Sequence, residues 1–437
     1  MRRGFFLIIF LCIGLFYPVF SPLNASANVS AITLSLDDAI ELGIDNNLNL
    51  KKNLIDLSSA DYSAHRLWSE IFPTISAGMG ISYSSNLFTG DGFEWNNNRA
   101  TYSANLGLNL TLNAGIPYSM RNIRLAYQTR LLNYEDARKQ LEIQLTKSFF
   151  GLIADRDNLT VLTDILNLAQ LQYEKNQVAF RNGLIRELTL MQSRLTLENA
   201  RYNLNYANSA YITRMDNFLI QLGFDHNADV KLEGKIETVR LELDADKLIS
   251  ENLFRRPDII GRRHEIERLE NAAKQTANAN RAPSLRLATD WSGRNFNPST
   301  DSLSGSATVS IPIDPWIPGT TRSQAVRNTH SAIEKARIDL QSTEESASAQ
   351  IRTLAANIKN SWGNIEIARL SLVIAERNHE LAEQGFRSGT IESLRLEDAQ
   401  NDLSYAHQRL LQTELSYFNM ILDVSAALNI SWKELLQ

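Results

Sequence analysis

The sequence predicts a mainly helical protein with four β-strands of membrane-crossing length, built from two copies of one structural unit. Residues 173–218 resemble residues 379–424, and Phe180-Arg181-Asn182-Gly183 returns 206 positions later as Phe386-Arg387-Ser388-Gly389. A repeat of this length means that one large unit occurs twice in the chain. We expect a helix, a β-hairpin and a long helical hairpin in each copy. The expected boundaries are 28–223 for the first copy, 224–247 for a connecting segment and 248–437 for the second copy.

Residues 1–27 are predicted to be a secretory signal peptide. Two arginines precede an apolar run over 5–20, and Ala25-Ser26-Ala27 offers a small-residue cleavage site. A transmembrane anchor is the alternative, but Pro18 interrupts the run, which is shorter than the roughly 20 residues that a membrane helix needs. Cleavage would remove Cys12, the only cysteine, so neither a disulfide nor a cysteine metal site is expected.

Two β-hairpins are predicted, over about 74–113 and 284–314. Their apolar residues alternate with Ser, Gly, Asn and Thr, which suits a sheet with one face in lipid and the other in water. About ten residues are enough for a tilted strand to cross a bilayer. For any single segment, a half-buried sheet of a soluble domain is the alternative. The apolar positions are Ile75, Ala77, Met79, Ile81 and Tyr83; Tyr102, Ala104, Leu106, Leu108, Leu110 and Leu112; Leu285, Leu287 and Trp291; Ala307, Val309, Ile311 and Ile313.

Four strands cannot close a barrel around water, and an open sheet edge is not tolerated in lipid. The chain is therefore expected to associate with copies of itself, in a barrel of eight, twelve or sixteen strands. Aromatic residues near the hairpin loops are expected to lie at the membrane interface. They are Phe88, Phe93, Trp95, Tyr102, Trp291 and Phe296.

Each copy continues into a long helix. The segment from Tyr118 to Asn182 has no proline and one glycine, so one continuous helix there would be about 100 Å long. Its apolar residues recur every seven positions, which is typical of coiled-coil packing. Such narrow seams bury little within one chain, so we expect other chains as neighbours. The seam positions are Leu145, Leu152, Leu159, Leu166, Tyr173 and Phe180, then Ile351, Ile358, Ile365, Leu372, His379 and Phe386, with His379 as the one break.

A glycine ends each of these series, and another seven-residue series follows it. Gly183 and Gly389 are predicted to be hairpin tips, because glycine past a helix end adopts the left-handed conformation that reverses the chain. Ile185 and Ile391 follow the two tips at matching positions.

Several short motifs occur along the chain. No one of them identifies a family, but their order and spacing together do. They are Leu36-Asp37-Asp38-Ala39-Ile40, Asn46-Asn47, Pro73 and Pro283 before the first strand of each copy, Arg256-Pro257-Asp258-Ile259, Phe180 to Ile185, Gly389 to Leu394, and Asp398-Ala399-Gln400-Asn401. Through them the chain resembles the TolC family of outer-membrane efflux channels over essentially its whole mature length. The resemblance implies a homotrimer whose twelve-stranded outer-membrane barrel continues as a helical tunnel in the periplasm. It also implies a periplasmic adaptor (membrane fusion) protein and an inner-membrane pump as partners, in drug efflux or type I secretion.

The resemblance further implies a gate at the periplasmic tips, lined by Leu394 and Asp398. These residues are one helical turn apart and share a face. Three leucines could form an apolar plug, and three carboxylates a ring that favours cations. Alternatively, Leu394 is a seam residue and Asp398 a solvated charge. The adaptor is expected to dock at the hairpin tips, around Gly183, Gly389, Ile185 and Ile391.

The chain departs from the family pattern in three respects. Arg395 stands where some members carry a second acidic residue, which would weaken a cation-selective ring. The first copy offers Leu188 and Gln192 at the equivalent level and adds no charge. Asn47-Leu48 replaces the usual Asn-Pro, so the helix after it is expected to begin less sharply.

Enzymatic and nucleic-acid-binding functions find no support in the sequence. The net charge is −5, with 44 basic and 49 acidic residues well mixed, whereas a nucleic-acid partner needs a basic face. The six histidines are dispersed, and no phosphate-binding glycine loop or serine elbow occurs, so no cofactor and no catalysis are expected. Two non-channel alternatives are a periplasmic adaptor, which carries one helical hairpin and usually a membrane anchor, and a coiled-coil structural protein of the cell envelope, which would not explain the strands.

Overall fold

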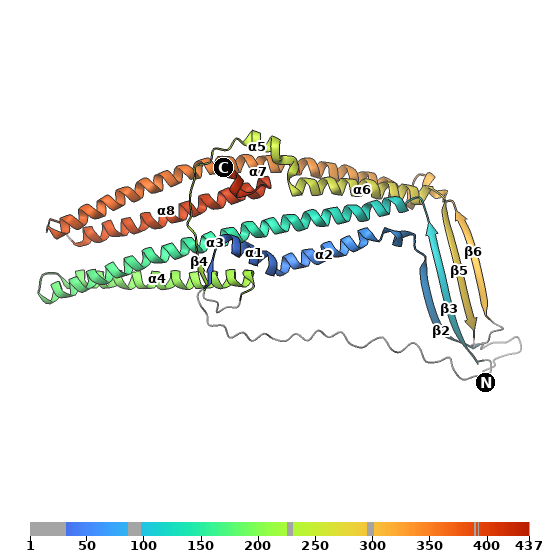
Figure 1. Ribbon diagram of the computed structural model, residues 1–437, viewed down its shortest axis with the longest axis horizontal. Coiled ribbons are helices and arrows are strands. Elements are labelled where there is room, and N and C mark those ends of the chain that lie inside the picture. Colours follow the sequence, from blue (N-terminus) through green and yellow to red (C-terminus); the bar gives the residue numbers. More distant parts are fainter. Residues whose placement is uncertain are drawn as a thin grey trace.

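The computed structural model describes residues 32–85, 98–224, 230–294, 301–388, 390–391 and 393–436. The predicted signal peptide and Gly389 lie outside these residues, as do the loop aromatics Phe88, Phe93, Trp95 and Phe296. The described part is an elongated body, with a sheet at one end and two helical hairpins extending to the other (Figure 1).

The sheet at the end of the body has four antiparallel strands in the order β2-β3-β5-β6. Its strands are β2 (Thr74–Ser85), β3 (Asn98–Leu112), β5 (Ser284–Arg294) and β6 (Ser302–Ser310). The central pairing, β3 with β5, joins the two copies and places Leu106 opposite Trp291. A short parallel pair, β1 (Ile32–Leu34) with β4 (Val230–Leu232), lies far from this sheet.

The fourth strand lies earlier in the chain than predicted. The alternation of apolar residues continues through Ile311 and Ile313, but β6 ends at Ser310. Pro312 has no backbone N–H to donate to a neighbouring strand, so the pattern beyond Ser310 does not form a strand.

Four long helices form the two hairpins. They are α3 (Ile116–Arg181), α4 (Glu187–Leu222), α7 (Thr321–Arg387) and α8 (Ser393–Leu428). The 66 residues of α3 span about 100 Å, as predicted. Within the described ranges, no helix is apolar enough over a sufficient length to cross a membrane.

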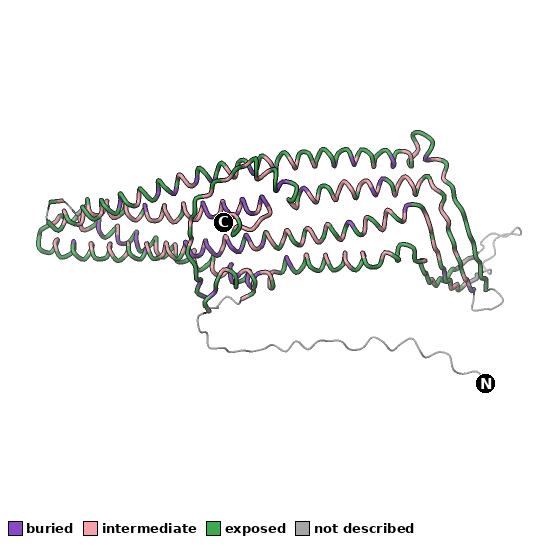
Figure 2. The backbone as a smooth tube through the Cα atoms, turned by 45° about the horizontal axis from the view of Figure 1, so that its top comes forward, coloured by how far each residue is buried: buried purple, intermediate pink, exposed green. Residues whose placement is uncertain are grey.

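Shorter helices complete each copy. In the first copy these are α1 (Leu36–Asn46), α2 (Leu48–His65) and the 3-10 turn η1 (Leu67–Ile71). In the second they are α5 (Ala245–Asn252), η2 (Leu253–Arg255), α6 (Pro257–Arg281), η4 (Asp314–Trp316) and the terminal α9 (Trp432–Leu435). Four helical rows, α2, α3, α6 and α7, adjoin the sheet (Figure 2).

The start of α2 is sharply defined, contrary to the expectation from its missing proline. The side-chain Oδ1 of Asn47 accepts hydrogen bonds from the backbone N–H groups of Asn49 (3.0 Å) and Leu50 (2.9 Å). An asparagine cap satisfies two of the free N–H groups at a helix start, so a proline is not needed there.

The Arg256-Pro257-Asp258-Ile259 motif fixes the start of α6 against the end of α8. The Arg256 guanidinium donates to both carboxylate oxygens of Asp258 (3.0 and 2.7 Å) and to the carbonyl of Ala427 (2.9 Å). Pro257 occupies the first helical turn, where a missing N–H is harmless, and Ile259 is fully buried. The motif is thus a structural joint between the two ends of the second copy.

The largest apolar core lies where α1 packs on α3 and α4. Leu145, Phe149 and Leu222 are almost completely buried there. Gly43 allows α1 to approach this core, because a Cβ at this position would lie 2.3 Å from Cδ1 of Leu145.

Residues 233–244 cross the second hairpin between β4 and α5, and we call this level of the molecule the waist (Figure 1). The hydroxyl of Tyr417 donates to the carbonyl of Val239 (2.8 Å) and accepts from the N–H of Leu241 (3.1 Å). Burial raises the pKa of the Tyr417 hydroxyl. Arg369 adds bonds to Thr238 (2.7 Å) and Glu414 (2.9 Å), so the connecting segment is bound to both α7 and α8.

We expect Gly43→Ala to destabilise the protein by about 1–3 kcal/mol, because the added methyl group overpacks the core at Leu145. Gly151→Ala is the matched control, since a Cβ there meets no atom within 4 Å. It should stabilise α3 by about 0.5–1 kcal/mol. Thermal unfolding of the two variants in detergent measures both effects; equal midpoints would contradict the close packing of α1.

Asp258 should make the protein sensitive to acid. Burial alone would raise the pKa of this carboxyl, but the Arg256 guanidinium and the Ile259 N–H outweigh burial and lower it. A lowered folded-state pKa gives stability that is present above the ordinary value of about 3.9 and is lost as the pH falls below it.

The Asp258→Asn variant should therefore unfold at a lower temperature than wild type at pH 7, with a difference that shrinks towards pH 3. Asp56→Asn, at an exposed position of α2, serves as the control. A constant difference between Asp258→Asn and wild type across this pH range would show that ionisation of Asp258 contributes nothing.

Candidate functional site

The sheet has one apolar and one polar face, as the alternation predicted. Ile75, Met79 and Ile81 project from the apolar face, and Met79 is 82 % exposed. The strand register places Leu106, Leu108 and Leu287 on the same face. The opposite face carries Ser, Thr, Asn and Gly on β2, β3 and β6, and Arg286, Asp290 and Arg294 on β5. An exposed apolar sheet face with a polar reverse is typical of a strand array between lipid and water.

Aromatic residues mark the end of the sheet that adjoins the helices, a feature that the sequence analysis missed. Trp68 of η1 packs edge-on against Phe72, with ring centroids 5.3 Å apart, and both are exposed. Trp316 of η4 is exposed at the corresponding junction of the second copy, with the Arg281 guanidinium 5.1 Å from its ring. The signal was present in the sequence, because both tryptophans lie within a few residues of a proline that bounds a strand. Exposed tryptophans at such a position are typical of a membrane interface.

The first hairpin tip has the geometry predicted for Gly183. Gly183 has a positive φ of 71°. The N–H of Leu184 donates to the carbonyl of Ala179 (2.8 Å), and that of Gly183 donates to Phe180 (2.9 Å). Together these bonds form a Schellman motif, which closes the end of a helix with its last carbonyl groups satisfied.

The second tip repeats the outer bond of this motif. The N–H of Thr390 donates to the carbonyl of Gly385 (2.9 Å), at positions equivalent to Leu184 and Ala179. Ile391 is half-buried and packs beside Gly385, as Ile185 is half-buried at the first tip. Both hairpins therefore end in closed turns.

The two predicted gate residues lie in the first two turns of α8. Leu394 and Asp398 are four residues apart on this helix, and the Asp398 side chain is exposed. The equivalent residues of the first copy, Leu188 and Gln192, are exposed on α4. Arg395 is exposed next to Leu394. The backbone thus brings the gate residues to one end of the second hairpin, directly after its tip.

Burial of the coiled-coil seam decreases from the waist to the tips. Leu145 and Ile365 are fully buried, whereas Leu166 and Leu372 are only half-buried. Near the tip, Phe180 is 39 % exposed. A single chain therefore leaves the tip half of both hairpins incompletely packed, which is where other subunits or partners have apolar surface to cover.

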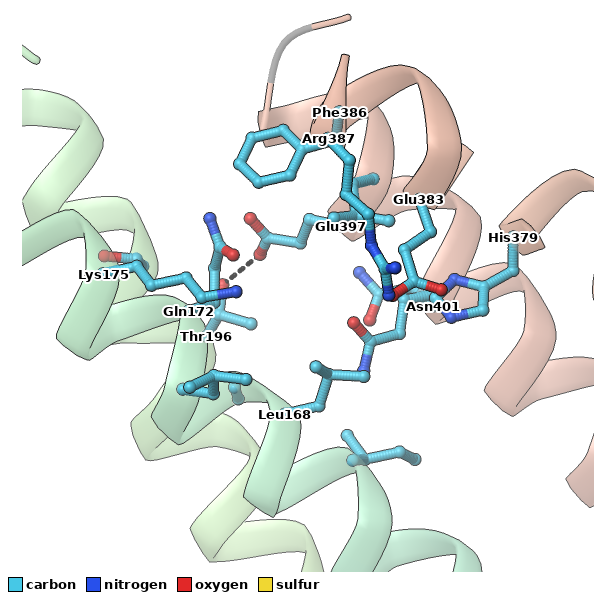
Figure 3. A pocket seen from close by; sticks show the side chains of 16 residues that line it. Leu168, Gln172, Lys175, Thr196, His379, Glu383, Phe386, Arg387, Glu397 and Asn401 are labelled. Atoms are coloured by element: carbon cyan, nitrogen blue, oxygen red, sulfur yellow. Dashed lines mark hydrogen bonds and ion pairs between the residues drawn. The ribbon is translucent and has the colours of Figure 1, made fainter. Parts of the chain in front are cut away.

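A cleft of about 430 Å³ separates the two hairpins near the tips (Figure 3). One hydrogen bond crosses it, from Thr196 Oγ1 to Glu397 Oε1 (2.6 Å). On the α7 side, Glu383 pairs with Arg387, and the buried Nδ1 of His379 has no hydrogen-bond partner. His379 is the residue that breaks the predicted apolar seam, and it lines this cleft. Within the described ranges, no cluster of His, Cys, Asp or Glu could hold a metal ion.

Comparison with known proteins matches this arrangement. The family model described as outer membrane efflux protein matches residues 39–217 and 248–429, one stretch in each copy. The probable efflux pump outer membrane protein TtgC of Pseudomonas putida is 24% identical, over 95% of this chain and 89% of that protein. The antibiotic efflux pump outer membrane protein ArpC of Pseudomonas putida has the same identity and coverage.

Solved structures share the fold. The CmeC outer membrane channel of Campylobacter jejuni superposes with a TM-score of 0.74 at 18% identity, over 90% of this chain and 85% of that one. The open state of the MtrE outer membrane channel of Neisseria gonorrhoeae gives a TM-score of 0.70 at 16% identity, over 94% of both chains. With a family model that covers most of both copies, this chain belongs to the outer membrane efflux protein family.

Proposed function

We propose that three copies of this chain close a twelve-stranded barrel in the outer membrane and join their hairpins into a periplasmic export duct. The unpaired edges of the sheet carry this proposal. Among the described residues, β2 and β6 each pair with a strand on one side only. Unpaired N–H and C=O groups are unfavourable in hydrocarbon, and pairing β2 of one copy with β6 of the next would satisfy both edges. Three four-stranded sheets supply the twelve strands of the barrel that the family resemblance implies, which supports a trimer.

The helices support the same assembly. Exposed apolar residues follow α4 and α7 at helical spacing, on surfaces that no other element of the described residues covers. On α4 they are Leu188, Met191, Leu195, Tyr202 and Tyr206, and on α7 they are Ile367, Leu370, Val373, Ile374 and Leu381. In a ring of hairpins, these surfaces would pack against neighbouring copies instead of water.

We place the gate of the duct at Leu394 and Asp398, and the docking surface for a periplasmic adaptor at the hairpin tips. Three copies would bring three leucines and three carboxylates to one level of the tunnel, as an apolar plug and an ionic ring. The duct itself has no energy source, so an inner-membrane pump would supply the energy for export. A single periplasmic adaptor has one hairpin, whereas this chain has two hairpins and a four-stranded sheet, which favours the channel.

A charge placed on the lipid side of the sheet should prevent assembly. Ala307→Arg, at the middle of β6 on the apolar face, is expected to destabilise the membrane-inserted state by about 2–4 kcal/mol. Ser306→Arg, at the preceding residue, whose side chain is on the polar face, is the matched control and should be tolerated. Light scattering of the detergent-purified proteins should give the mass of three chains for wild type and Ser306→Arg, with little trimer for Ala307→Arg. A monomeric wild-type protein would contradict the proposed assembly.

Loss of either proposed gate residue should loosen the closed tip. Leu394→Ser would remove the proposed apolar plug and Asp398→Ala the proposed ionic ring, so single-channel conductance in planar bilayers should rise in both variants. Gln192→Ala, at the position of the first copy equivalent to Asp398, is the control and should leave conductance unchanged. Wild-type conductance in Leu394→Ser and Asp398→Ala would rule out this gate.

A further inference from the structure

The polar face of the sheet carries its charges on one strand. Where side chains are described, this face presents only Ser, Thr, Asn and Gly on β2, β3 and β6. On β5 it presents Arg286, Asp290 and Arg294, spaced four residues apart. The apolar face has no charged side chain among the same residues. Among the side chains that the structure describes, charge is thus restricted to one strand and one face.

The register fixes where each charge lies. Arg286 is opposite Thr308 of β6, and its Nε donates to Asn109 Oδ1 on β3 (3.1 Å). Asp290 is opposite Ser304 of β6 and leans over Gly107 of β3, where a Cβ would lie 2.9 Å from Oδ1 of Asp290. Four residues of an extended strand span about 13 Å, so neighbouring charges are well separated along β5.

We propose that these residues form a charge ladder of alternating sign inside the membrane part of the duct. The inference rests on the proposed function, because it requires the polar face to line a water-filled lumen. Two arginines and one aspartate of β5 lie on this surface, and their charges alternate in sign along the strand. In a trimer, each level becomes a ring of three equal charges: a cationic ring near the helices, an anionic ring in the middle and a second cationic ring towards the loops.

The ladder places rings of alternating charge beyond the cation-favouring carboxylates proposed at the tips. The other strands carry small neutral residues on this face, which leaves the lumen wide. The rings therefore act through their electrostatic potential and not by filling the lumen. Such a potential extends about 10 Å at 0.1 M salt and about 3 Å at 1 M salt. Its effect should therefore decline steeply as salt is added.

Cysteine modification measures the potential at each level directly. The only natural cysteine, Cys12, lies in the predicted signal peptide, so single cysteines can be introduced at Thr308 and Ser304, opposite Arg286 and Asp290. In proteoliposomes, each cysteine is treated with an anionic and a cationic methanethiosulfonate of similar size, and the two rates are compared. A unit charge about 6 Å away in water changes each rate about threefold.

We expect Thr308→Cys to react faster with the anionic reagent, and Ser304→Cys faster with the cationic one. Adding Arg286→Gln should abolish the first preference and Asp290→Asn the second, whereas Arg286→Lys should preserve the first. All preferences should disappear in 1 M salt. Equal rates for both reagents at Thr308→Cys in low salt would overturn the charge ladder.

A third cysteine separates this result from failure of the proposed function. Ala307→Cys lies on the apolar face, next to Thr308, and should be protected by lipid from both reagents. If Ala307→Cys reacts as fast as Thr308→Cys, the sheet does not span the membrane and the channel proposal fails. If Ala307→Cys is protected while Thr308→Cys shows no charge preference, only the charge ladder fails.

Discussion

Backbone N–H and C=O groups inside a membrane must find partners within protein, and this requirement connects the sheet to the rest of the molecule. Every strand of the sheet continues into a helix: α2 leads into β2, β3 into α3, α6 into β5 and β6 into α7. Closing the sheet edges between copies would therefore bring the helical rows of each copy into one ring. The proposed barrel and tunnel are two results of the same pairing.

The two copies share a backbone plan but have different side chains at key positions. Gly223 ends α4 in a left-handed conformation, and Asn429 ends α8 in the same way. Unlike glycine, Asn429 also donates a hydrogen bond to the carbonyl of Arg255 (3.3 Å). Asparagine is among the few residues other than glycine that adopt this conformation readily, so the second copy gained a side-chain contact without losing its turn.

Much of the fold could be predicted from the sequence because its signals are periodic. The seven-residue seams gave the long helices, and the alternation gave the faces of the sheet. The end of β6 was placed wrongly because the alternation through Ile313 outweighed the effect of Pro312. The start of α2 is more sharply defined than predicted, because the side chain of Asn47 caps this helix and no proline is needed.

The functional surfaces could be predicted from the sequence only in part. The junction tryptophans, Trp68 and Trp316, gave no periodic signal, and only the structure places them at equivalent ends of the sheet. The charges of β5 lie in a strand that was predicted from three apolar residues only, and their common face depended on the strand register. The roles of Leu394 and Asp398 remain predictions, because they concern contacts between copies.

Closed turns at the tips limit how the duct could open. The hydrogen bonds from Leu184 to Ala179 and from Thr390 to Gly385 hold each turn together, so fraying would break them before widening a passage. The second hairpin, which Tyr417 binds to the connecting segment, would instead move as a stiff lever about that level. About 24 residues separate Tyr417 from the start of α8, so this arm is about 36 Å long. A tilt of about 5° would then carry the tip by about 3 Å, which multiplies a small motion at the pivot into one comparable with the width of a side chain.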